Sequence, residues 1–264
     1  MKILFLGDIV GRPGRESVAK ILPHLTKRYQ PDITIANAEN VAHGKGVTES
    51  SLQELIAMGI DFFTSGNHVW RKEGKKLLQD SSVPLIRPAN YPVGVLGRGY
   101  DIINIRTQKI AIINLIGRVF FHSDYDCPFK KADEILAEIA REKCNAIFVD
   151  FHCEATSEAR AMGFYLDGRI SAIVGTHTHV QTSDDQLLPK KTAYITDTGM
   201  CGIKNSILGR DQAEIIEVFL KQDSVEADWK NDWKECIVQG VFIETGKDGK
   251  AKKIERVLEI VENK

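Results

Sequence analysis

The chain has 264 residues, and its 35 Lys and Arg residues nearly balance its 36 Asp and Glu residues, giving a net charge of -1 at pH 7. This balance provides no general attraction for nucleic acid or an anionic membrane, so any polyanion site must be local. The longest apolar run near the start, 3–6, is too short for a signal peptide or a membrane span, which predicts a cytoplasmic protein. The five cysteines form no CxxC pair, so the sequence suggests neither a disulfide framework nor a thiolate zinc site.

Strand-like apolar runs alternate with segments of helical period through the first two-thirds of the sequence, which is typical of βα units wound around a sheet. We predict strands at 2–7, 32–38, 61–65, 101–106, 109–115, 145–151, 170–175, 192–196, 236–245 and 252–260. We predict helices at 14–29, 48–58, 70–79, 129–142, 154–166 and 211–221, the second of them capped by Thr48. The absence of repeats and linkers predicts one domain over residues 1–264.

Polar residues that can bind metal ions follow five of the predicted strands, at the points where the strands end. They are Asp8, Glu39 and Asn40, Asn67 and His68, His152, and the pair His177 and His179. Because the carboxyl ends of strands in open α/β sheets face one crevice, we expect these segments to converge. Carboxylates, amides and imidazoles together suit first-row cations such as iron, manganese or zinc, at a pair of ions ~3.5–4 Å apart. The sequence therefore predicts a dinuclear metal centre.

The two histidines of the 177–179 segment are predicted to lie in extended backbone, where residues two apart project to the same side. Each could then bind a different ion of the pair, and the carboxylate of Glu39 would fit a bridging position.

Each of these residues also has a structural interpretation when it is considered alone. Asp8 could cap the following helix or lie in a turn, Glu39 could face solvent from a loop, and Asn67 could cap a helix. His152 could be a hydrogen-bonded core histidine. We favour the metal centre because the structural interpretations require five independent coincidences at five strand ends.

Other residues have weaker claims to a functional role. His43, in the glycine-rich loop at 42–46, could border the substrate crevice, although this loop lacks the GxxxxGK[ST] spacing of a phosphate-binding P-loop. Trp229 and Trp233 could be packing anchors or a ligand platform.

The chain also resembles a known group of proteins. The segments GD at 7–8, GNH at 66–68 and GTHTH at 175–179 are similar to motifs of the calcineurin-like metallophosphoesterase superfamily. More closely, the chain resembles the YmdB-type bacterial phosphodiesterases, through LGDIVGRPGR at 6–15, NAEN at 37–40, SGNHVW at 65–70 and GTHTHVQT at 175–182. The usual DxH histidine is missing after Asp8, and Glu39 replaces the usual bridging aspartate. The YmdB-type group shares both departures.

The resemblance implies an α/β/β/α sandwich of mixed sheets with helices on the outside. It also implies phosphodiesterase activity on cyclic nucleotides (2',3'- and/or 3',5'-cyclic), with iron as the preferred metal, manganese or zinc as alternatives, and a homo-oligomer. One ion would be held by Asp8, Glu39, Asn40 and His179, and the other by Glu39, Asn67, His152 and His177. His68 would be the proton donor.

Two cations beside a bridging water would lower its pKa from 15.7 toward ~7 and so supply hydroxide, while His68 protonates the leaving oxygen. A phosphomonoesterase or an RNA-related nuclease is a rival within the same enzyme class, although a nuclease would need a basic groove. A regulatory module that binds metal and affects RNA turnover is a rival of another class. A purely structural ion is disfavoured because such sites are closed by four strong ligands.

Overall fold

The fold is described from a computed structural model that covers residues 1–222 and 232–263. Two mixed β-sheets face each other. The first has seven strands in the order β2-β11-β12-β1-β3-β4, with β13 paired to β12. These strands are β1 (Lys2–Leu6), β2 (Asp8–Ile9), β3 (Ile33–Asn37), β4 (Phe62–Thr64), β11 (Met200–Ile203), β12 (Glu235–Thr245) and β13 (Ala251–Glu262). Parallel pairing of β1 with β3 and of β3 with β4 brings their carboxyl ends to one edge.

The second sheet has six strands in the order β5-β6-β7-β8-β10-β9. They are β5 (Tyr100–Ile105), β6 (Gln108–Ile116), β7 (Ala146–His152), β8 (Ala172–Thr176), β9 (Gln186–Leu187) and β10 (Ala193–Ile195). β6, β7, β8 and β10 pair in parallel, whereas β5 and β9 are antiparallel edge strands.

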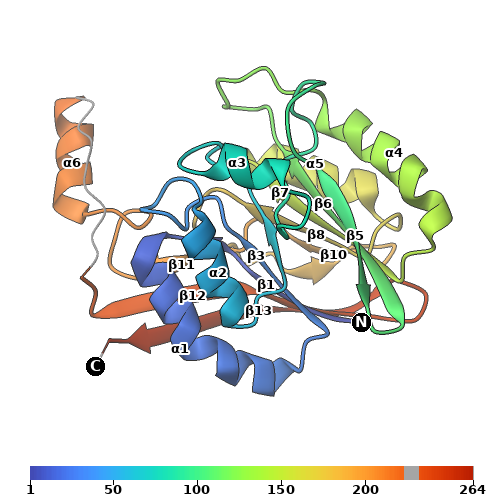
Figure 1. Cartoon of the computed structure of the whole chain (residues 1–264), viewed down its shortest axis with the longest axis horizontal. Helices are drawn as coiled ribbons and strands as arrows, with labels where there is room; N and C mark the ends of the chain where they lie inside the picture. The colour runs from blue at the N-terminus through green and yellow to red at the C-terminus, as the bar shows by residue number, and fades with distance from the viewer. Residues whose placement is uncertain (223–231, 264) are drawn as a thin grey trace.

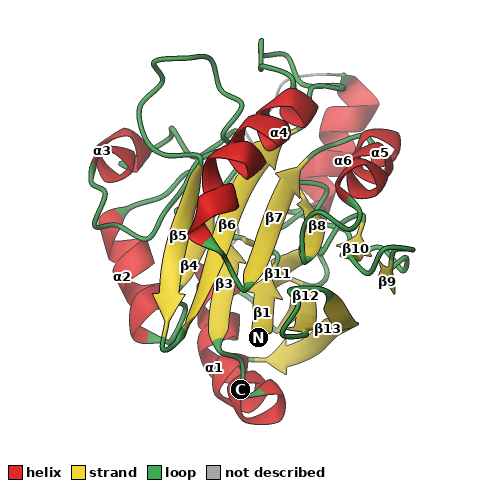
Figure 2. Ribbon diagram, turned by 90° about the vertical axis from the view of Figure 1, so that its right-hand side faces the viewer, coloured by secondary structure: helices red, strands yellow, loops and turns green. Residues whose placement is uncertain are grey.

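Helices cover the outer faces of both sheets. They are α1 (Gly11–Tyr29), α2 (Glu49–Ala57), α3 (Gly74–Gln79), α4 (Pro128–Ile139), the 3-10 turn η1 (Ala140–Glu142), α5 (Thr156–Leu166) and α6 (Gln212–Lys221). Figure 1 shows α1 and α2 beside the first sheet, α4 and α5 beside the second, and α6 standing away from the body. Figure 2 shows β5, β6, β7 and β8 running side by side behind α4. The predicted α/β/β/α sandwich is confirmed.

The alternation of side chains along β1 explains the layers. Leu4 and Leu6 join the core beneath α1, whereas Ile3 and Phe5 point to the other face and join the core between the two sheets. There the rings of Phe5 and Phe148 lie 5.2 Å apart. A third core lies between the second sheet and helices α4 and α5. Burying one side chain of this size contributes ~1.5–3 kcal/mol, so both faces of each sheet help hold the layers together.

The structure differs from the predicted elements mainly at their ends. α1 begins at Gly11 rather than 14, and α3 begins at Gly74 rather than 70. The strands β2, β9 and β11 were not predicted, because runs of two to four residues carry no measurable period and form only through pairing with distant strands. The predicted Thr48 cap is confirmed, since its side chain accepts a hydrogen bond from the Ser51 amide.

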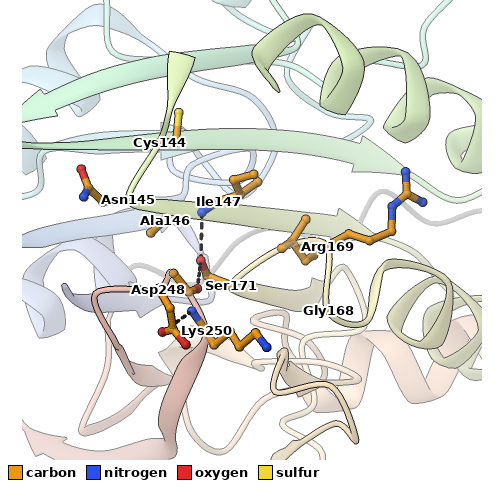
Figure 3. Close-up of a pocket in the computed structure, with 11 residues that line it drawn as sticks. Cys144, Asn145, Ala146, Ile147, Gly168, Arg169, Ser171, Asp248 and Lys250 are labelled. Carbon is orange, nitrogen blue, oxygen red and sulfur yellow. Dashed lines mark hydrogen bonds between the residues drawn. The ribbon is translucent and has the colours of Figure 1, made fainter. Parts of the chain in front are cut away.

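The β12–β13 hairpin docks against the second sheet at the amino ends of β7 and β8 (Figure 3). The Ser171 hydroxyl donates to the Gly249 carbonyl at 2.6 Å and accepts from the Ile147 amide at 3.0 Å. A cavity of about 130 Å³ lies here, at the opposite end of these strands from His152 and Thr176.

Two further predictions concern the tryptophans and the membrane. Trp233 is buried in the core beneath α1, and its indole nitrogen donates to Glu16 at 2.9 Å, so it is a packing anchor. Trp229 lies outside the described residues. Among the helices that the structure describes, none has the length and apolar character needed to cross a membrane.

Candidate metal centre

The polar residues predicted to converge do lie together, at the carboxyl ends of strands from both sheets. Asp8 and His152 are fully buried and Glu39 is 1% exposed, so the interpretation of Glu39 as a solvent-facing loop residue is wrong. Asp8 does not cap α1 either, because the N-cap residue of this helix is Val10 and α1 has no side-chain cap hydrogen bond. Nor does Asn67 cap a helix, since α3 has Glu73 at its N-cap.

Glu39 lies at the centre of this cluster. Its Oε1 is 3.0 Å from His68 Nδ1 and accepts from Asn40 Nδ2 at 3.2 Å. Its Oε2 lies 3.5 Å from His152 Nε2 and accepts the His68 amide at 3.0 Å. Both carboxylate oxygens are therefore directed at groups from other strand ends.

One group of side chains lies on the Asp8 side of Glu39. Asn40 Nδ2 is 3.3 Å from Asp8 Oδ1 and 3.2 Å from His179 Nε2. His179 Nε2 is in turn 3.7 Å from Asp8 Oδ1. Asp8, Asn40 and His179 thus share one small volume.

A second group lies on the β7 side of Glu39. His152 Nε2 is 3.1 Å from Asn67 Oδ1 and 3.0 Å from His177 Nδ1. Ligand atoms of Glu39, His152 and His177 all lie within 4.8 Å of one another, an arrangement that could hold a metal ion. The assignment of all seven predicted ligands stays a prediction.

The three imidazole rings share a feature that fits metal binding. In each ring one nitrogen meets an acceptor of the protein: Thr176 Oγ1 at 3.0 Å from His152 Nδ1, Glu154 Oε2 at 3.1 Å from His177 Nε2, and the Leu208 carbonyl at 3.3 Å from His179 Nδ1. The other nitrogen faces the cluster. Metal-binding histidines almost always donate their second N–H in this way, which leaves a lone pair for the ion.

Burial keeps these imidazoles neutral. It lowers the pKa of His152 to about 3 and that of His179 to about 4, and it also lowers the pKa of His177. At neutral pH the rings therefore do not need to lose a proton before they bind a cation.

The carboxylates of Asp8 and Glu39 are buried close to each other. Burial, and then the nearby charge of Glu39, raise the pKa of Asp8 well above its ordinary value. Burial opposes ionisation of Glu39 too, but hydrogen bonds from the ring and the amide of His68 favour the charged carboxylate, and the pKa of Glu39 lies below its ordinary value. A bound cation would relieve the cost of holding two carboxylates in this buried space.

The prediction that the 177–179 segment is extended is wrong. His177 has a backbone φ of 105° and His179 a φ of 62°, and residues other than glycine rarely adopt such positive φ angles. The His177 amide donates to Asp8 Oδ2 at 3.1 Å, and the Thr178 amide donates to Asp197 Oδ2 at 3.0 Å. Such strain persists where the surroundings over-determine the backbone, and here it turns the two rings toward different sides of Glu39.

The position before Asn67 has room only for a glycine, Gly66. A Cβ at this position would lie 2.2 Å from both Glu39 Oε2 and His152 Nε2, closer than real contacts allow. We therefore expect Gly66→Ala to push these side chains apart and lower the affinity for Mn²⁺ by at least about tenfold, the scale typical of disturbed metal ligands. Titration of metal-free protein with Mn²⁺ measures this.

The matched control for that substitution is Gly202→Ala on β11. A Cβ there would come no closer than 3.3 Å to a neighbour, so Mn²⁺ affinity should be unchanged. Equal losses in the two variants would show that Gly66 has no special relation to the cluster.

A cavity of about 250 Å³ opens onto the cluster. Its lining includes Lys45, His68, His177 and Arg210. The His68 side chain is 27% exposed, so it belongs both to the cluster and to the surface a ligand would meet. Of the glycine-rich loop, Gly44 and Lys45 line the cavity, whereas His43 is exposed and lies outside its lining.

Sequence reasoning missed several residues at the site. Glu154 and Thr176 hold imidazole nitrogens, and the Phe121 ring lies 4.9 Å from the ring of His177. Asp150 hydrogen-bonds Thr176. The sequence did contain a signal that Asp150 faces the site. Residues two apart on a strand point to the same face of the sheet, and Asp150 lies two residues before His152.

Two mixed sheets covered by helices, with GD, GNH and GTHTH segments at the ends of their strands, define a metallophosphoesterase. This class of fold implies divalent metal ions, and Glu39, His152 and His177 form a group that could hold one. The chain belongs to the family of YmdB-like proteins, whose model matches residues 4–257. It is an enzyme of the phosphoric diester hydrolase class.

Relatives span almost the whole chain. The 2',3'-cyclic-nucleotide 2'-phosphodiesterase of Bacillus subtilis (strain 168) is 47% identical over 98% of this chain and 97% of its own length. The crystal structure of a novel phosphatase from Mycoplasma pneumoniae has a TM-score of 0.91 and 33% identity, covering 100% of this chain and 94% of that one. A hypothetical protein from Thermus thermophilus has a TM-score of 0.90 and 35% identity, covering 98% of this chain and 99% of that one.

Proposed function

We propose that the protein hydrolyses small phosphodiesters, with 2',3'- and/or 3',5'-cyclic nucleotides as preferred substrates, at a centre of two first-row metal ions. The name of the Bacillus subtilis relative, a 2',3'-cyclic-nucleotide 2'-phosphodiesterase 47% identical to this chain, supports the substrate class. Iron is the metal we favour, and manganese and zinc are the alternatives, because mixed imidazole, amide and carboxylate ligands suit all three.

The observation that carries the proposal is the arrangement of the three imidazoles around Glu39, each with one nitrogen on a protein acceptor and the other toward the cluster. We propose Glu39 as the bridging ligand. The remaining ligands would be Asp8, Asn40 and His179 for one ion, and Asn67, His152 and His177 for the other.

When bound, two such cations would lower the pKa of a water molecule between them and neutralise charge on the phosphoryl oxygens. His68 would be the general acid. Its Nδ1 lies 3.0 Å from Glu39 Oε1 and 2.9 Å from Asn40 Oδ1, so an N–H there has two acceptors. His68 Nε2 would carry the proton that passes to the leaving oxygen as the bond from phosphorus to that oxygen breaks.

The cavity suits a small anionic diester rather than a long polymer. Its volume is about 250 Å³, and Lys45 and Arg210 add positive charge to a lining that also contains the carboxylates of Glu39 and Glu154. The chain as a whole carries a net charge of -1, which provides no general attraction for extended RNA. One domain over residues 1–264, a cytoplasmic location and a homo-oligomer stay predictions.

The test is metal analysis of anaerobically purified protein, combined with assays on 2',3'-cyclic AMP, 3',5'-cyclic AMP, bis(p-nitrophenyl) phosphate and p-nitrophenyl phosphate. We expect about two metal ions per chain and faster hydrolysis of the diesters than of the monoester. Fewer than about one metal ion per chain would count against the centre, and preference for the monoester would favour a phosphomonoesterase.

A further inference from the structure

A buried polar bridge joins the two sheets directly beneath the cluster. Asp150 on β7 accepts hydrogen bonds at Oδ2 from Asn37 Nδ2 at 3.1 Å and from the Thr64 hydroxyl, both at the ends of strands of the first sheet. At Oδ1 it accepts from the Thr176 hydroxyl of β8 at 2.7 Å. Asp150 is fully buried, and so are Asn37, Thr64 and Thr176, so each polar atom here must find its partner within the protein.

The hydroxyl of Thr176 links this bridge to His152. A hydroxyl has one hydrogen to donate, and Thr176 donates it to Asp150. Toward His152 Nδ1, 3.0 Å away, it can then only accept, which favours the tautomer with the proton on Nδ1. In that tautomer the lone pair of Nε2 faces Glu39, Asn67 and His177.

We infer that Asp150 is a positioning residue that acts through Thr176 to set the tautomer of His152, and so prepares Nε2 of His152 to bind a metal ion. This inference rests on the proposed metal centre. It assigns Asp150 a role beyond cross-linking the sheets, since a well-packed apolar pair could join the sheets without directing a proton.

The decisive substitution is Asp150→Asn, which changes the direction of the hydrogen bonds without changing the shape of the side chain. Two donors, Asn37 and Thr64, face the Oδ2 position, so the amide oxygen should occupy it and the NH₂ group should face Thr176. The Thr176 hydroxyl would then accept from the amide and direct its own hydrogen at His152 Nδ1. The imidazole proton would move to Nε2 and block the metal-facing lone pair.

The first readout is the ¹⁵N NMR signature of the His152 ring in metal-free protein, which distinguishes the two neutral tautomers. We expect the Nδ1–H form in the wild type and the Nε2–H form in Asp150→Asn. The second readout is the affinity for Mn²⁺, which should fall by about 10–100-fold in Asp150→Asn and in Thr176→Val, the scale for partners that orient metal ligands.

Thr64→Val is the matched control. It removes a hydrogen bond from the same carboxylate, at the oxygen that does not face Thr176. The variant should keep the Nδ1–H tautomer and the Mn²⁺ affinity of the wild type, even if its midpoint of urea unfolding falls.

Two outcomes would overturn the inference: an unchanged tautomer in Asp150→Asn, or equal losses of Mn²⁺ affinity in Thr64→Val and Thr176→Val. The latter would show that the bridge acts only through stability. Wild-type protein that binds no Mn²⁺ would instead count against the metal centre itself, and the NMR comparison would still decide the tautomer.

Discussion

Glu39→Gln is expected to lower kcat/KM for cyclic nucleotides by more than about 10³-fold. Both oxygens of Glu39 face groups of the cluster, His68 and Asn40 at one and His152 at the other, and the substitution replaces one of them with an NH₂ group that cannot bind a cation. Several kcal/mol of charge stabilisation in the transition state would be lost, at about 1.36 kcal/mol for each tenfold in rate. Steady-state assays with added Mn²⁺, together with elemental analysis, measure this effect.

The control for Glu39→Gln is Glu49→Gln on α2, where the side chain is 56% exposed and pairs with Lys76. That change should leave kcat/KM and metal content as in the wild type. Folded Glu39→Gln protein that retains full turnover would contradict the bridging role. If turnover is lost but effects on RNA turnover in cells persist, the regulatory module would regain support.

His68→Ala is expected to lower kcat on cyclic nucleotides by about 10²–10⁴-fold while the metal content is retained, because the proton donor is removed and every proposed metal ligand remains. A p-nitrophenolate leaving group needs little protonation, so the loss on bis(p-nitrophenyl) phosphate should be much smaller. The comparison of kcat on the two substrates therefore separates general-acid help from a general disturbance of the site.

The control for His68→Ala is His24→Ala on the exposed face of α1, which should behave as the wild type. Loss of bound metal in His68→Ala would indicate that His68 is a metal ligand. The metal content of this variant must therefore be measured, because His68 Nδ1 lies only 3.0 Å from Glu39 Oε1. Equal losses on both substrates would also contradict the role of proton donor.

The fold was predictable to the extent that its elements have a clear period. The long strands and the amphipathic helices were recognisable because they bury one face or one stripe. β2 and β11 were not recognisable, although they extend the first sheet beside Asp8, because their pairing links residues 8–9 to residues 200–203. A local pattern cannot encode a hydrogen bond to a strand so distant in the chain.

The sequence by itself determined which chemical groups meet at the cluster, because the carboxyl ends of parallel strands must lie at one edge and Asp8, Glu39, Asn67 and His152 stand at those ends. Only the tertiary structure decided how the groups are directed. The positive φ angles of His177 and His179 depend on hydrogen bonds that the backbone amides of His177 and Thr178 donate to Asp8 and Asp197. Both aspartates lie outside the 177–179 segment in the sequence. The nitrogen that each imidazole presents is likewise set by acceptors such as Thr176, Glu154 and the Leu208 carbonyl, which only folding brings into contact with the rings.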